Sequence, residues 1–426
     1  MAFRFLKRVM GGSVVGDASR LLLANAVAQA IGLLIYPLLT RLFTAEDFGL
    51  FNLFFSIAGI LILFATGQYE YAIVLPRSER QGAWALHCGL TCTAAVVTLC
   101  VVALPFGSAI GHLFGSEQLN GILWLMPLYV ALMAVWTLIN YWLTRQRQFQ
   151  RIAEFQVGQS VLNAATKVLL GKVRLASGLI LGSVIGPLTS LVVTILRTPR
   201  RLFTPLKQWS RRGRRAAAHR YRNFPIYVLP KSVAENFAGN LPFFLLSPAF
   251  GLEMVGFFGM ALTLAYRPLQ MIAVSVNQVL FQRSAECVQK GTRLMPLIHR
   301  WLLSAAGVAV PVLAVLWLVL PQLCAWLLGT EWVETGNYIR LMLPWLLFVL
   351  LVVSINFIPD LFGKQRGMLI ILVIRLILQT AGLIVGIALD SSMLAVGLFF
   401  AVGLAALVAQ LVWFLSLINR YESKLK

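Results

Sequence analysis

Acidic residues are scarce in this 426-residue chain, which has 15 Asp and Glu against 36 Lys and Arg, and only four histidines. Catalytic sites gather acids, bases or nucleophiles in one place. The sequence contains no Gly-rich loop for phosphate, no Ser/His/Asp set and no cluster with metal-ligand spacing. We therefore expect a protein that is not an enzyme and that needs no cofactor.

Cysteine is also sparse. The five cysteines are Cys88, Cys92, Cys100, Cys287 and Cys324. Cys88 and Cys92 stand one helical turn apart in an apolar segment, where a free cysteine commonly serves as a small apolar side chain. We expect neither a disulfide nor a metal site.

Hydrophobic residues, in contrast, make up 59% of the chain, and the mean hydropathy is +0.82. Apolar runs of roughly 20 residues recur, which is the length a helix needs to cross a hydrocarbon core of about 30 Å. Lipid offers the backbone no hydrogen-bond partner, so such runs must be helices or a closed barrel. Runs of this length without period-two alternation favour helices, and the predicted fold class is an all-α polytopic membrane protein. The twelve predicted spans are 18–40, 48–73, 82–104, 120–143, 152–171, 175–196, 224–247, 253–281, 297–320, 337–358, 368–389 and 392–418.

The basic residues are distributed unevenly along the chain. Most lie in the N-terminal segment, the even-numbered connections and the C-terminal tail, whereas the other connections hold only Arg41, Lys172 and Arg174. This is the positive-inside pattern, and it predicts that both termini are cytoplasmic. The N-terminal segment "MAFRFLKRVM" precedes the first span without a small-residue cleavage site, so we expect that helix to be retained.

A phrase between the first two spans recurs near the middle of the chain. "YPLLTRLFTAEDFGLFN" (36–52) matches "LLSPAFGLEMVGFFG" (245–259) when shifted by 207 positions, which aligns Glu46 with Glu253. Six spans per half is an even number, so the halves run parallel. Transporters built from parallel repeats place their site between the halves. We predict two parallel six-helix bundles around a central cavity, with domains 1–196 and 223–426 joined by a basic cytoplasmic linker, 197–222.

The linker "RTPRRLFTPLKQWSRRGRRAAAHRYR" has no acidic residue. It is interpreted first as a topology determinant. An alternative is an amphipathic segment that lies on anionic lipid, because Leu202, Phe203, Leu206 and Trp209 are interspersed with the charges. Nothing surrounds it that could present the charges to nucleic acid, so we expect no nucleic-acid partner.

Charged and polar residues inside the predicted spans are the candidate site residues, because ionisable groups in a membrane are costly and commonly functional. The candidate substrate-binding residues are Arg267, Lys231, Glu235, Arg375, Lys167, Asn25, Gln29 and Asn163. Each charged residue also has a structural alternative. Arg267 could bond neighbouring helices, Lys231 and Glu235 could neutralise each other at i, i+4, and Lys167 and Arg375 could snorkel. Since cations outnumber acids, a cavity lined by these residues favours an anionic cargo.

The first turn phrase, the segment "AYRPLQMIAVSVNQVLFQRSAE" (265–286) and the two-half layout resemble the Wzx-type oligosaccharide flippases of the polysaccharide transport family, in the multidrug/oligosaccharidyl-lipid/polysaccharide exporter superfamily. The resemblance covers nearly the whole chain. It implies alternating access and a cationic central cavity. The implied cargo is an undecaprenyl-diphosphate-linked oligosaccharide for O-antigen or other surface polysaccharide, moved across the bacterial inner membrane. Implied partners are membrane lipids, a polysaccharide polymerase and a chain-length regulator.

Two departures argue against a lipid II flippase. Spans thirteen and fourteen of those proteins are absent, and the first span has only Arg20, at its rim, where they carry an arginine set. A cation-coupled multidrug exporter is a further alternative, although an acid would be expected deep in the first helices and only Glu70 occurs, near a span end. A membrane-embedded polymerase or glycosyltransferase is a third, although no sizeable outer loop exists to hold its site.

Overall fold

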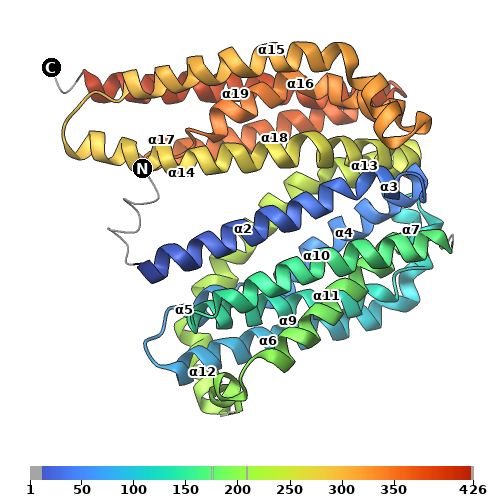
Figure 1. Cartoon of the computed structure of the whole chain (residues 1–426), viewed down its shortest axis with the longest axis vertical. Coiled ribbons are helices and arrows are strands. Elements are labelled where there is room, and N and C mark those ends of the chain that lie inside the picture. The colour runs from blue at the N-terminus through green and yellow to red at the C-terminus, as the bar shows by residue number, and fades with distance from the viewer. Residues whose placement is uncertain (1–11, 174, 176, 208–209, 424–426) are drawn as a thin grey trace. The chain divides into compact units, whose positions relative to one another are not determined.

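The computed structural model describes residues 12–173, 175, 177–207 and 210–423, and the regular structure throughout these ranges is helical (Figure 1). This confirms the predicted all-helical class. The chain divides into two compact units, Met1–Phe244 and Leu245–Lys426. The boundary lies inside one long helix, α13, so most of the predicted seventh span belongs to unit 1.

Unit 1 contains the helices that precede this boundary. They are α2 (Gly12–Leu34), α3 (Tyr36–Leu39), α4 (Ala45–Thr66), α5 (Glu70–Val74), α6 (Glu79–Ala103), η1 (Leu104–Phe106), α7 (Gly107–Leu113), α8 (Glu117–Asn120), α9 (Leu125–Arg145), α10 (Phe149–Lys172), α11 (Gly178–Arg197), η2 (Arg200–Lys207), α12 (Arg211–Arg220), η3 (Phe224–Val228) and the first part of α13 (Leu229–Ala261).

Unit 2 begins in the last part of α13. It continues with η4 (Leu262–Tyr266), α14 (Arg267–Gln289), α15 (Met295–Leu328), η5 (Thr330–Trp332), α16 (Val333–Val353), α17 (Ile358–Leu361), α18 (Gln365–Ala388) and α19 (Ser392–Glu422).

Where they are described, the predicted spans fall on helical segments, and fewer than twelve of these segments meet the length and hydropathy of a membrane crossing. In the part of the chain that the structure describes, nine segments are long and apolar enough to cross a membrane. One of them, Phe224–Gln289, includes both predicted spans seven and eight. The predicted spans 18–40 and 152–171 coincide with α2–α3 and α10, which are not among the nine. Twelve crossings therefore remain a prediction.

In unit 1, α10 lies between α2 and α11, while α4, α6 and α9 pack against one another (Figure 1). The contact between α10 and α11 is close because two glycines of α11 meet the α10 backbone. A side chain at Gly182 would meet Lys167, and one at Gly186 would meet Asn163. Small residues of this kind let helix backbones approach in membranes. These contacts fix the positions of Lys167 and Asn163 on α10 relative to α11.

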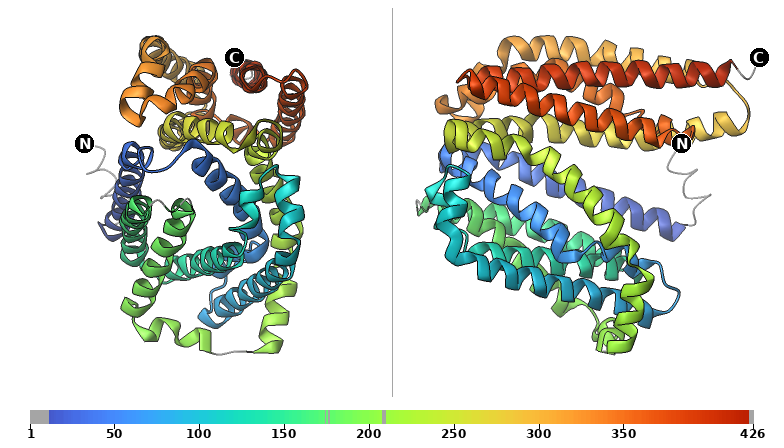
Figure 2. Two further views of the ribbon diagram at one scale, coloured as in Figure 1. Left: turned by 90° about the vertical axis from the view of Figure 1, so that its right-hand side faces the viewer. Right: turned by 180° about the vertical axis from the view of Figure 1, so that it is seen from behind.

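In unit 2, α15 packs against α16, and α19 packs against both α16 and α18, as the red and orange ribbons of Figure 2 show. Its core includes Val349, Val352, Leu407 and Phe414. Gly403 of α19 faces Gln379 of α18 and Trp345 of α16, so three helices meet there around one small residue.

The two turns matched by the sequence repeat are both helix starts. Thr44 is the N-cap of α4, and its side chain and that of Asp47 form a capping box. The shift of 207 positions places Gly251 opposite Thr44. Gly251 interrupts α13 with φ 82° and ψ 175°, a combination open essentially to glycine alone. The repeated phrase therefore marks the same structural event in each unit, achieved by different means.

The basic linker is folded where it is described. It forms η2 and α12, and α12 packs against α6. Trp209, one of the apolar residues predicted to contact anionic lipid, lies outside the described residues. The same holds for the N-terminal segment 1–11 and the tail 424–426, on which the prediction about both termini rests.

Candidate functional site

Lys167 and Asn163 lie on α10, next to α11 and α4. The Lys167 ammonium sits 4.5 Å from the centre of the Phe51 ring of α4, a cation–π distance. Ser183 of α11 donates a hydrogen bond to the Asn163 Oδ1, at 3.5 Å. Both predicted residues are half-buried inside unit 1. This position places the Lys167 charge inside the helix bundle of unit 1.

Asn25 and Gln29 lie on α2, which packs against the α10 helix that carries Lys167 and Asn163. Asn25 is half-buried and Gln29 is exposed. The four residues thus belong to one pair of adjacent helices in unit 1, and their role in binding stays a prediction.

Lys231 and Glu235 form an ion pair on α13, with 3.8 Å between Nζ and Oε1. The side chains are 72% and 53% exposed. An exposed pair at i, i+4 contributes roughly 0.3–0.5 kcal/mol in water. Both groups remain accessible to a charged ligand.

The neutral face of α13 makes stronger contacts that the sequence reasoning missed. Ser56 of α4 donates to the Asn240 Oδ1 at 2.9 Å, and Asn240 in turn donates to the Asn236 Oδ1 at 3.0 Å. Ser232 donates to the Gln68 Oε1 at 3.2 Å. These bonds tie the first part of α13 to α4 within unit 1. Two asparagines four residues apart in a predicted span could have predicted this polar face, but the candidate residues were chosen mainly by charge and did not include them.

Arg267 begins α14, directly after the π-helical segment η4. Pro268 follows it and lacks the N–H that would bond the carbonyl four residues earlier, which explains why the regular helix is interrupted there. π-helical segments occur frequently at functional sites. The Arg267 side chain is exposed. The regular helix is therefore loosened directly before this exposed arginine.

Arg375 of α18 lies close to the residue that precedes Arg267. Its guanidinium and the Tyr266 phenol are near enough to interact electrostatically. Tyr266 also contacts Trp345 of α16, with 5.3 Å between ring centroids. Gln379, one turn beyond Arg375, donates to the Phe399 carbonyl at 3.2 Å. The Tyr266–Arg375 contact joins segments 109 positions apart, so sequence reasoning could not predict it.

The candidate residues accordingly form two groups, one in each unit. Unit 1 carries Lys167 and Asn163 on α10, the two amides on the neighbouring helix α2, and Lys231 and Glu235 on α13. In unit 2, Arg375 lies close to Tyr266, the residue before Arg267. Both groups have a net positive charge. Among the residues that the structure describes, no group of three His, Cys, Asp or Glu side chains is placed to hold a metal ion.

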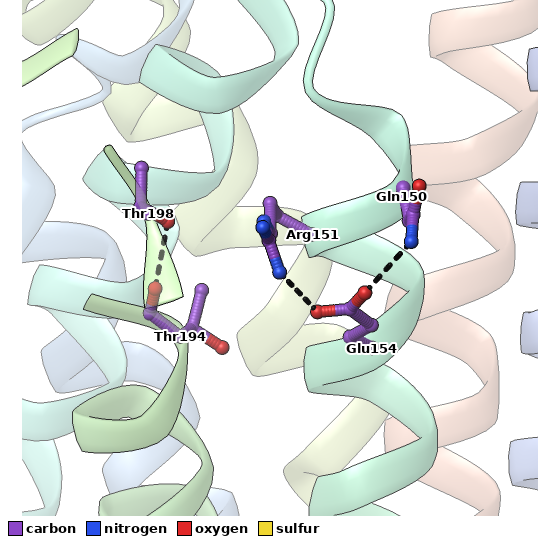
Figure 3. Close-up of polar contacts among 5 residues, drawn as sticks. All are labelled: Gln150, Arg151, Glu154, Thr194 and Thr198. Carbon is purple, nitrogen blue, oxygen red and sulfur yellow. Dashed lines mark hydrogen bonds and ion pairs between the residues drawn. The ribbon is translucent and has the colours of Figure 1, made fainter. Parts of the chain in front are cut away.

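The single acidic residue of α10, Glu154, is neutralised locally. Figure 3 shows the Glu154 carboxylate accepting hydrogen bonds from Arg151 Nη1, at 2.8 Å, and from Gln150 Nε2, at 3.0 Å. On α11, Thr198 donates to the Thr194 carbonyl at 2.6 Å. Glu154 therefore does not offset the charge of Lys167.

A sequence model of the family described as polysaccharide biosynthesis protein matches residues 38–337. The chain belongs to this family. A search of curated proteins finds no match.

Comparison with solved structures shows the fold. The chain is similar to the lipid II flippase MurJ in an inward closed conformation, with a TM-score of 0.69, 11% identity, and coverage of 96% of this chain and 90% of that one. It is also similar to an inward-facing multidrug resistance MATE family transporter of the MOP superfamily, with a TM-score of 0.60, 14% identity, and coverage of 94% and 95%. A MOP superfamily transporter from Pyrococcus furiosus matches with a TM-score of 0.52, 14% identity, and coverage of 95% and 96%.

Membership of this family agrees with the predicted polysaccharide transport group, and the solved structures show that the chain shares the fold of multi-pass membrane transporters. The fold of a lipid II flippase matches over almost the whole chain. A shared fold therefore does not separate flippases by cargo.

Proposed function

We propose that the protein is a flippase that moves undecaprenyl-diphosphate-linked oligosaccharide units across the bacterial inner membrane for O-antigen or other surface polysaccharide. The observation that carries the proposal is the exposed Arg267 directly after a π-helical segment, in the unit where Arg375 lies close to Tyr266. In a chain of the polysaccharide biosynthesis family, a cationic site of this kind suits a diphosphate.

Arginine matches the chemistry of the cargo. Its guanidinium can hold two oxygens of a phosphate in fork geometry, which a lysine ammonium cannot do. The exposed Arg267 has the freedom to bind and release such a group. Tyr266 next to it restricts where the Arg375 guanidinium lies.

The wider proposal keeps the predicted architecture. Two related halves, 1–196 and 223–426, would alternate access to a central cavity, with both termini and the linker 197–222 in the cytoplasm. A polysaccharide polymerase and a chain-length regulator would take the exported units. The protein itself would catalyse no covalent step.

The test is glycan export in cells that depend on this protein. Arg267→Gln should abolish surface glycan at normal protein levels and cause lipid-linked intermediates to accumulate, and Arg267→Lys should be intermediate because it keeps the charge without the fork. Arg283→Gln is the matched control, since Arg283 is also exposed on α14. Full glycan display by Arg267→Gln would leave Arg267 a packing residue and remove the main support for the proposal.

A cation-coupled multidrug exporter is the second candidate, favoured by the similarity to the MATE family transporter. The two candidates differ in what a deletion strain shows. Loss of a drug exporter raises sensitivity to cationic dyes and leaves the glycan intact, whereas loss of the flippase removes the glycan.

A further inference from the structure

Unit 1 contains a cavity of about 530 Å³ that none of the candidate residues above lines. It lies at the N-terminus of α4, between that helix, the α8–α9 turn and the α10–α11 turn. Its polar and aromatic lining includes Thr44, Glu46, Asp47, Gln118, Trp124 and Ser177. The volume falls within the roughly 300–1,000 Å³ typical of small-molecule pockets.

The polar groups of this cavity are held in place by one another. The Gln118 Nε2 donates to the Glu46 Oε1 at 2.8 Å, joining α8 to α4. The Asp47 Oδ2 accepts from the Thr44 N–H and hydroxyl, at 2.9 and 3.1 Å. Each bond engages one oxygen of its carboxylate, so the second oxygen of each and the carbonyl oxygen of Gln118 are available as acceptors. The wall therefore presents preorganised acceptors.

The apolar part of the wall is dominated by Trp124, the residue before α9. Its side chain is 59% exposed, although it lines the cavity. An indole offers a flat apolar face together with one N–H donor. A ligand with a flat, weakly polar C–H face and hydroxyl groups at its edge would satisfy both parts of this wall.

The charges of the cavity select the class of ligand. Among the lining residues that the structure describes, two are carboxylates and none is a cation, which disfavours a phosphate or a uronic acid. No group of three metal-binding side chains occurs among the residues described, and a metal ion would gain nothing from the indole. The described lining therefore suits the sugar end of the proposed cargo better than its diphosphate end.

We propose that this cavity binds a neutral or amino sugar of the oligosaccharide, stacked on Trp124 with its hydroxyls donating to Glu46 and Gln118. The inference rests on the flippase function proposed above and deepens it, since it assigns the two ends of the cargo to different places. The turn that carries Glu46 lies on the predicted outer side, so the site would receive the sugar after transfer.

The test uses the glycan released by mild acid from the lipid-linked intermediates that accumulate in cells lacking this protein. Calorimetric titration of this glycan into the purified protein in detergent gives the Kd of the complex. Trp124→Ala should weaken binding about tenfold or more, as truncation of a buried-on-binding tryptophan does, and Trp124→Phe should weaken it less. Trp326→Ala is the control for a general interfacial tryptophan, because Trp326 is 76% exposed on α15.

Glu46→Gln separates a sugar site from a cation site. Glutamine replaces the charged acceptor of the sugar hydroxyl by a neutral one, so glycan affinity should fall by roughly fivefold to tenfold, less than complete loss. Sodium or calcium chloride, titrated in the same way, should give no heat that depends on Glu46. Cation binding abolished by Glu46→Gln, without glycan binding, would overturn the sugar site.

Two further outcomes separate this inference from the function on which it rests. If intermediates accumulate but the Trp124→Ala and Trp326→Ala variants bind the glycan equally, only the sugar site is overturned. If cells lacking the protein accumulate no lipid-linked intermediate, the flippase function fails, and the sugar site fails with it.

Discussion

At the scale of single residues, a charge in a membrane helix can be structural, and Arg340 shows how. Pro321 in α15 has no N–H, so the carbonyl of Trp317, four residues earlier, loses its helical partner. Arg340 of α16 donates its Nε to that carbonyl at 2.6 Å and its Nη2 to the Leu318 carbonyl at 3.0 Å. The arginine therefore satisfies a helix defect in its own unit, in contrast to the exposed Arg267.

This pairing predicts a coupling between two substitutions. Arg340→Met should destabilise the protein, because it leaves carbonyls of α15 unpaired, and it should cost much less when Pro321→Ala has restored a helical donor. Charge-assisted hydrogen bonds contribute about 1.5–3 kcal/mol, so a coupling free energy of about 1–3 kcal/mol is expected. Unfolding in mixed micelles measures it. Equal destabilisation in both backgrounds would contradict the assignment.

At the scale of elements, small residues attach the basic linker to α6 within unit 1. Ser210 caps α12 by accepting from the Gly213 N–H at 3.1 Å. A side chain at Gly213 would collide with the Trp84 ring of α6, and Ala217 is buried in the same contact. The Cys88 thiol donates to the Arg214 carbonyl at 3.4 Å. The arginines on the other face of α12 remain exposed.

Gly213→Leu should release α12 from α6, since overpacking of a close contact costs typically 1–3 kcal/mol. Trypsin should then cleave the linker about tenfold faster or more, because cleavage follows the population of the open form. Ala216→Leu is the matched control on the exposed face of the same helix. Similar cleavage rates for both variants would show that the linker is held elsewhere.

The helices themselves were predictable because roughly 20 apolar residues in a row have few alternatives in lipid. The short helices α5, α7 and α8 and the segment η4 were not, since they depend on local turns and on Pro268. The site was predictable only in part. Arg267 and Lys167 stand out as charges in apolar runs, whereas the Tyr266–Arg375 contact and the Gln118–Glu46 bond join distant segments. No periodicity reports such partners.

At the scale of the whole molecule, the charge asymmetry makes a prediction about sidedness. A single cysteine replacing Glu46 or Glu334 should react with a membrane-impermeant maleimide added outside intact cells, because these residues lie on the side poor in Lys and Arg. A cysteine replacing Arg212 or Lys364 should react only after the membrane is permeabilised. The five native cysteines are replaced first, so that only the introduced cysteine can react. Reaction at position 212 from outside would reverse the topology.

The two matched helix starts differ in how each can change over time. At position 44 the start of α4 depends on side chains, and serine, asparagine or aspartate can replace a threonine N-cap. Residue 47 is free to change with it. At position 251 the start depends on a backbone conformation that no L-amino acid with a side chain adopts cheaply. If one ancestral segment gave rise to both, position 44 can still accept several residue types, whereas position 251 can accept only glycine.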